Sequence, residues 1–327
     1  MRKIAIASIV LGMFAALTLP SSSASVLSSE TWVSGTGSDM NNNCFSQATP
    51  CREIYTALSN TSANGTVHVL PGYYLGVPID KGVDVIADQG QAIIYAAYQA
   101  SDDGFYGIYV HAGAGDTVRI RGLTINEDYL AGGIYFDQGA ALHLENCTMV
   151  RSTPITAGLK VVPATAATGG VPTELSVRNS IIGANRGGNV LIAPTNGVAV
   201  AASFDNTLMI EGTYGIRADT SAGSGLIRVD VTNSRAKGNT NNGYLAVGTG
   251  SNAVHFMIDR STAENNGAYG AVATGSNAFM IVTYSTLMGN GTGLAQQSGA
   301  TVASTGTNTI NFNTTNTSGT ITPITPK

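Results

Sequence analysis

The sequence predicts an all-β solenoid, a fold in which the chain winds through successive coils of similar length. Seven segments share one pattern, beginning with VRIRGLTI at Val118 and LHLENCTM at Leu142. The fifth residues of the seven segments are Gly122, Asn146, Asn179, Asn206, Asn233, Arg260 and Tyr284. Their spacings are 24, 33, 27, 27, 27 and 24 residues, and a period in the twenties is typical of solenoids. The 43% of hydrophobic residues provides a core, while scattered basic residues and a net charge of −4 argue against nucleic acid as a partner.

Residues 1–24 have the pattern of a secretory signal peptide. The charged pair RK precedes an apolar run that ends at Pro20, and the small residues SSA that follow form a cleavage site. No later apolar run approaches the length of a membrane span. We therefore expect an exported protein, secreted or periplasmic, with no membrane span once the leader is removed.

The next segment, residues 25–65, is predicted to end in a short capping helix. Ile54, Tyr55 and Leu58 form one apolar stripe in PCREIYTALSN, just before the strand-like TVHV. The helix is expected to cover the open end of the first coil, which would otherwise expose its core. In an oxidising compartment the two nearby cysteines of this segment are close enough to form a disulfide. They are Cys44 and Cys51.

Residues 66–313 are predicted to form the solenoid, and residues 314–327 a Thr/Asn-rich tail. Equivalent positions on successive coils stack about 4.8 Å apart, so the alignment can be read in columns. Two columns are apolar and should face the core. They are Ile120, Leu144, Val177, Phe204, Val231, Ile258 and Val282, and Val118, Leu142, Leu175, Ala202, Val229, Phe256 and Met280. A later Gly-apolar pair, as in Gly215-Ile216, predicts a third strand and hence a three-sided coil.

Polar columns are expected at the corners between strands. Four consecutive Asn occupy the fifth-residue column, where Asn suits the left-handed conformation of a sharp turn and its side chains can bond along the axis. A second Asn-lined turn is predicted six places further on, at Asn185, Asn239, Asn266 and Asn290. Cys147 falls in a column of Ser and Thr and is expected to be a buried thiol.

Several stretches match a known group of proteins: WVSGTGSD, the cysteine pair before REIYTAL, VRIRGLTIN, and the turns AENNGAYG and GNGTG. Through them the mature chain resembles secreted bacterial right-handed parallel β-helix repeat proteins of the pectate-lyase-like superfamily, over nearly all of residues 30–313. The resemblance implies a single-stranded right-handed parallel β-helix with a short N-terminal capping helix. The superfamily is rich in polysaccharide lyases and hydrolases, but this group brings no established reaction with it.

A first candidate site lies on the outward face of one sheet, where Asp205, Asp230 and Asp259 fall on three consecutive coils above Arg178. In an enzyme, Asp205 and Asp259 would have nearly the separation of inverting-glycosidase carboxylates, and the three could hold Ca²⁺ in a lyase. In a scaffold, the same positions continue a ladder of alternating charge that begins at Arg121. Polygalacturonase-like motifs and clustered basic residues are absent from the sequence, which favours the ladder.

A second candidate site is the stretch 95–137, where tyrosines and acidic residues are interleaved. Sugars bind to aromatic faces and to carboxylates. Tyr109 and Tyr135 each follow an inward Ile and are expected to point outward and stack on each other. The other ligand-binding candidates are Tyr106, Asp102, Asp103, Glu127, Asp128 and Asp137. Alternatively, the aromatic residues pack the first coils and the cap.

Three functions follow from these patterns. The favoured one is an exported β-helix that binds a polysaccharide or another cell-surface component without catalysis and without a cofactor. The second is a polysaccharide lyase or glycoside hydrolase that acts on the Asp205/Asp230/Asp259 face. The third is a structural repeat protein of the envelope or the secreted fraction.

Overall fold

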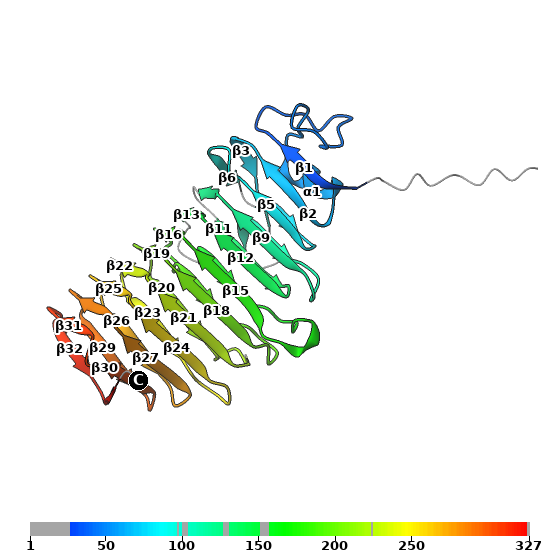
Figure 1. The fold of residues 1–327 in the computed structure, drawn as a ribbon. Coiled ribbons are helices and arrows are strands. Elements are labelled where there is room, and N and C mark those ends of the chain that lie inside the picture. Colours follow the sequence, from blue (N-terminus) through cyan, green and yellow to red (C-terminus); the bar gives the residue numbers. More distant parts are fainter. Residues whose placement is uncertain are drawn as a thin grey trace, which may run out of the picture.

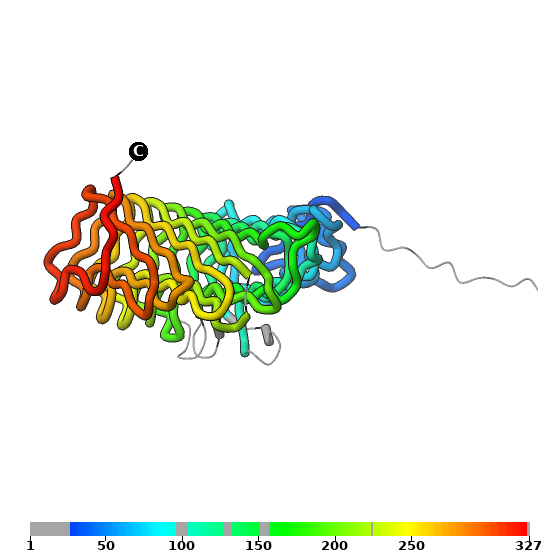
Figure 2. Tube along the Cα trace, turned by 90° about the horizontal axis from the view of Figure 1, so that it is seen from below, coloured from blue at the N-terminus to red at the C-terminus, as the bar shows by residue number. Residues whose placement is uncertain are grey.

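The computed structural model describes residues 27–96, 98–99, 104–126, 131–150, 157–223 and 225–325. These residues form three parallel sheets of 12, 10 and 11 strands, which the chain visits in turn on every coil. The fold is the right-handed parallel β-helix that the sequence predicts. Figure 1 shows the strands stacked in sequence order from the α1 end to the C-terminal end, and Figure 2 shows the elongated body that results.

Within each sheet the strands stack in sequence order along the solenoid axis. Sheet 1 contains β1 (Ser28–Val33), β2 (Thr61–Val69), β5 (Val83–Ile86), β9 (Thr117–Arg121), β12 (Ala141–Glu145), β15 (Thr173–Arg178), β18 (Val200–Asp205), β21 (Ile227–Thr232), β24 (Val254–Asp259), β27 (Ala278–Thr283), β30 (Thr301–Thr305) and β33 (Ile321–Ile324). Sheet 2 contains β3 (Gly72–Leu75), β6 (Ala92–Ala96), β10 (Leu123–Asn126), β13 (Thr148–Val150), β16 (Ile181–Gly183), β19 (Leu208–Ile210), β22 (Arg235–Lys237), β25 (Thr262–Glu264), β28 (Thr286–Met288) and β31 (Thr309–Asn311). Sheet 3 contains β4 (Val77–Ile79), β8 (Phe105–His111), β11 (Ala131–Gln138), β14 (Leu159–Val161), β17 (Val190–Ile192), β20 (Tyr214–Asp219), β23 (Asn242–Val247), β26 (Tyr269–Thr274), β29 (Thr292–Gln297) and β32 (Thr315–Ser318), with β7 (Tyr98–Gln99) antiparallel to β8.

The two predicted apolar columns lie inside the solenoid, on sheet 1. Every member of both columns is at most 3% exposed, from Val118 and Ile120 on β9 to Met280 and Val282 on β27. Fully burying one such side chain contributes about 1.5–3 kcal/mol, so the stacked columns are a main source of stability. Because successive side chains of a strand point to opposite faces, the residues between these columns face outward.

The fifth-residue column forms the corner between sheets 1 and 2, as predicted. All seven of its residues have positive φ, between 45° and 78°. Asn and Gly tolerate this conformation, whereas Arg260 and Tyr284 adopt it at a cost of about 1–2 kcal/mol each. In the exposed Asn column, the Asn206 amide donates to Asn179 Oδ1 over 2.8 Å, which confirms bonding along the axis.

The second Asn column is buried and forms a continuous ladder. The side chains of Asn239 and Asn266 each donate to the Oδ1 of the Asn on the next coil over 2.9 Å, and the Asn290 amide continues the ladder to Asn313 Oδ1 over 3.0 Å. Where the coil carries Gly212 instead of Asn, the side chain of Asn189 enters the vacant position and donates to Asn239 Oδ1 over 2.9 Å. Each coil thus satisfies the polar groups of its neighbour inside the corner.

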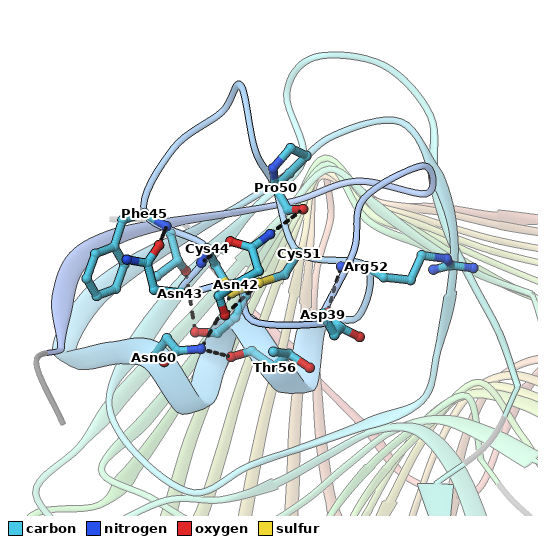
Figure 3. The surroundings of a disulfide bond; sticks show 12 residues. Asp39, Asn42, Asn43, Cys44, Phe45, Pro50, Cys51, Arg52, Thr56 and Asn60 are labelled. Carbon is cyan, nitrogen blue, oxygen red and sulfur yellow. Dashed lines mark hydrogen bonds between the residues drawn. A yellow bond between two sulfur atoms is a disulfide. The ribbon is translucent and has the colours of Figure 1, made fainter.

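The N-terminal cap consists of helix α1 (Ile54–Asn60) and a loop closed by the predicted Cys44–Cys51 disulfide (Figure 3). Both half-cystines are fully buried, and the amide of Asn42 holds the loop by donating to three backbone carbonyls. The predicted helix stripe is wrong in one position. Ala57 is buried with the two aliphatic residues of the stripe, while Tyr55 is 61% exposed.

The segment predicted as a tail continues the solenoid. Strand β32 pairs with β29 and strand β33 pairs with β30, so regular structure extends to Ile324. The side chains of this segment are largely exposed, which is why hydrophobic patterning gave no sign of the two strands. Among the described residues, no helix is long and apolar enough to cross a membrane.

Candidate surface groove on sheet 1

The outer face of sheet 1 is hollowed over β5, β9, β12 and β15, and this groove has a volume of about 420 Å³. Charged and polar side chains from the outward positions of these four strands line most of it. They are Asp84, Arg119, Arg121, His143, Glu145, Glu174, Ser176 and Arg178. The strict alternation of each strand brings these side chains to one face, and the parallel register places them side by side on successive coils.

Several charges at the groove are already paired. Arg119 lies 3.4 Å from Asp84, and Arg121 lies 3.1 Å from Asp88 at the edge of the groove. Both pairs are partly exposed, so each contributes at most about 1 kcal/mol to stability. Their main consequence is to fix the guanidinium groups in place along the groove.

His143 lines the groove, and its Nε2 lies 3.5 Å from Glu174 Oε1. Burial lowers the pKa of His143 below its usual 6.5, against the opposing charge of Glu174. The imidazole is therefore mainly neutral at pH 7 and can both donate and accept a hydrogen bond. Sequence reasoning placed His143 in an outward column but gave it no role.

Glu145 and Arg178 differ from the charges around them. They are register partners on β12 and β15, and both are exposed. Within the described part of the chain, neither side chain has an ion-pair or hydrogen-bond partner. A carboxylate and a guanidinium with free hydrogen-bonding groups thus lie next to each other in the groove.

An aromatic pair extends the same outward column toward the N-terminal end. Trp32 on β1 and His68 on β2 are register partners, and their rings stack with centroids 5.0 Å apart and planes 15° apart. The register partner of His68 on β5 is Ile86, which lines the groove. Trp32 is the only Trp of the chain, and its outward position follows from the inward Val33 next to it.

The structure places the first sequence-predicted site further along the same sheet. Asp205 accepts hydrogen bonds from Thr232 (3.2 Å) and Asn233 (2.9 Å). Asp259 is buried, accepts a bond from Thr283 over 2.7 Å and pairs with the neighbouring Arg260.

The third carboxylate, Asp230, is exposed beside Met257, one column away from the other two. Arg178 adjoins Asp205 in register but lines the groove. Two of the three carboxylates are thus bonded to neighbouring side chains of the protein. In the described ranges, no three His, Cys, Asp or Glu side chains are grouped so that they could hold a metal ion.

The second predicted site is brought together only in part. Asp102, Asp103, Glu127 and Asp128 lie outside the described residues. The remaining aromatic residues form one cluster on β8 and β11, in which the ring centroids of Tyr109 and Tyr135 are 5.6 Å apart. The two rings are tilted by 48°, and Tyr106 packs against Tyr135 at 4.9 Å.

Most of this tyrosine cluster is inaccessible to a ligand. Tyr106 is fully buried and Tyr135 is 6% exposed, with the Lys160 ammonium 5.4 Å above its ring. Asp137 accepts a hydrogen bond from the Tyr109 hydroxyl (2.9 Å) and lies 2.7 Å from His111 Nδ1. The arrangement is that of a packed cluster rather than of an open aromatic platform.

No family model and no curated protein matches the chain. Among solved structures, the pectate lyase Pel9A is similar with a TM-score of 0.44 and 17% identity, over 86% of this chain and 70% of that one. At this identity the likeness says nothing about activity.

Proposed function

We propose that this chain is an exported protein that binds a polysaccharide along the outer face of sheet 1. The observation that supports the proposal is the groove, with Glu145 and Arg178 free to bond a ligand while the charges around them are paired. Export is consistent with the buried Cys44–Cys51 disulfide, because disulfides persist in oxidising compartments.

The chemistry of the groove suits a chain of hydroxyl-bearing rings. Planar carboxylate and guanidinium groups form paired hydrogen bonds with neighbouring oxygens of a ligand. Arg178 can donate hydrogen bonds to hydroxyls or to a carboxylate, and Glu145 can accept them from hydroxyls. Neutral His143 can both donate and accept a hydrogen bond. Because the side chains repeat at the strand spacing of about 4.8 Å, an extended polymer can meet a hydrogen-bonding group on each successive coil.

The test is a binding titration of the purified protein against a panel of acidic and neutral polysaccharides. Arg178→Ala should weaken binding at least about tenfold, because a hydrogen bond to a charged group is lost. Arg186→Ala is the matched control, since Arg186 is an exposed arginine at the corner between β16 and β17. It should bind as the wild type does.

Two outcomes would contradict this proposal. Absence of binding to every member of the panel, or equal binding by both arginine variants, would remove the groove as the binding site. Release of soluble fragments that disappears in Asp230→Ala would instead establish the lyase or hydrolase alternative on the Asp205/Asp230/Asp259 face.

A further inference from the structure

The C-terminal half of sheet 1 carries an apolar patch on its outer face. Met257 on β24 and Phe279 and Ile281 on β27 are 37–40% exposed, and they line a shallow pocket of about 340 Å³. Elsewhere on this face the outward positions are mostly charged or polar. Three large apolar side chains on two adjacent strands indicate an interaction surface rather than chance exposure.

Two opposite charges border the patch on the next strand. Arg228 and Asp230 occupy two of the outward positions of β21, and both line the same pocket. Neither has an ion-pair partner among the described residues. Each is therefore available to a partner that carries the opposite charge.

The register arranges these side chains in two parallel columns along the solenoid. One column reads Arg228, His255, Phe279, and the other reads Asp230, Met257, Ile281. A two-fold axis that runs along the solenoid between the columns would place each strand antiparallel to the same strand of a second copy. Arg228 would then face Asp230 of that copy, and Phe279 would face its Ile281.

We propose that the patch is the contact of a symmetric dimer, in which a second copy of this chain packs sheet 1 against sheet 1. An isologous contact requires a surface that is complementary to itself, and this pairing of opposite charges and of apolar groups satisfies that requirement. The contact uses side chains of β21, β24 and β27 and none of the residues that line the groove, so it does not depend on the proposed polysaccharide binding.

Sedimentation analysis of the purified protein over a range of concentrations tests the dimer. The wild type should dimerise reversibly. Arg228→Asp and Asp230→Arg should each raise the dissociation constant at least about tenfold, since like charges would face each other. The double variant Arg228→Asp/Asp230→Arg should restore dimerisation, because the exchanged charges again oppose one another across the axis.

Phe279→Ser should also weaken the dimer, while Ile181→Ser should not. Ile181 is the matched control because it is 40% exposed on the outer face of sheet 2. A monomer at every concentration, or a dimer that Phe279→Ser and both charge reversals leave intact, would overturn the proposal. The proposal would also be overturned if the wild type is a monomer and Phe279→Ser weakens polysaccharide binding. The patch would then belong to the glycan-binding surface.

Discussion

The buried corner of the solenoid and the groove on sheet 1 differ in whether their polar side chains have hydrogen-bond partners. In the corner, the side-chain amides of Asn239, Asn266 and Asn290 donate to the next coil, and their Oδ1 atoms accept from the preceding coil. In the groove, Glu145 and Arg178 lie side by side and bond to no other described side chain. A polar group that completes its neighbours belongs to the scaffold, whereas one held in a hollow without a partner is available to a ligand.

The largest effect is expected from breaking the buried ladder. Asn266→Ala removes the acceptor for both the backbone N–H and the side chain of Asn239. Buried donors left without partners should lower the free energy of unfolding by about 3 kcal/mol. Denaturant unfolding measures this loss, and Asn206→Gly, in the exposed corner column, should cost less than about 1 kcal/mol. Similar losses in both variants would contradict a special role for the buried ladder.

A smaller effect should follow where the ladder is bridged from another position. Asn189→Ala should cost about 1–2 kcal/mol, because it leaves the ladder open at Gly212. Adding Gly212→Asn to that variant should restore most of the loss, since the repeat places Asn at this position on the neighbouring coils. Without Asn189→Ala, Gly212→Asn should destabilise the protein, because its side chain would meet the Asn189 amide. If the double variant is no more stable than Asn189→Ala alone, the bridging interpretation fails.

The contribution of His143 to the free energy of unfolding should depend modestly on pH, and the sign of this dependence is defined. Burial lowers the folded-state pKa of His143 below the 6.5 of the unfolded chain. Its neutral form is favoured in the fold, so its contribution to stability is present above pH 6.5 and is lost as the pH falls below that value. The difference in unfolding free energy between the wild type and His143→Gln should therefore shrink from pH 7 to pH 5. A difference that grows over this range would contradict the assignment.

The smallest effect is expected at Cys147. Its thiol takes the place of a hydroxyl in the column of Ser and Thr side chains next to the corner between sheets 1 and 2. Its backbone N–H donates to Ser180 Oγ over 3.1 Å, as that of Ser234 does to Ser261. Burial raises the thiol pKa to about 11, so the native protein should resist thiol-labelling reagents until it unfolds. Cys147→Ser should change stability by less than about 1 kcal/mol, because the new hydroxyl repeats its neighbours. Rapid labelling of the thiol in the native protein would show that Cys147 is accessible to solvent and would contradict this prediction.

The sequence predicts the solenoid well because a period fixes many positions at once. The inward columns and the left-handed corner residues, from Asn146 to Asn233, follow from alignment alone. The bridging role of Asn189 does not, since that residue comes from a different place in its coil.

The groove was beyond sequence reasoning for a similar reason. Asp84, which pairs with Arg119 in the groove, lies in a stretch whose coil boundaries the repeat does not reveal. In addition, no sequence pattern shows which charged side chains lack partners. Tyr135 was expected at the surface because alternation gives the direction of a side chain. Alternation does not show what covers that side chain, and in the fold the ring is buried.

The most direct test compares stability with binding in one variant, Glu145→Ala/Arg178→Ala. If these side chains serve a ligand, their loss should abolish polysaccharide binding and change the free energy of unfolding by less than about 0.5 kcal/mol, as exposed positions do. A variant that binds as tightly as the wild type but unfolds more easily would show that the pair belongs to the scaffold, and would contradict the assignment of the groove as the binding site.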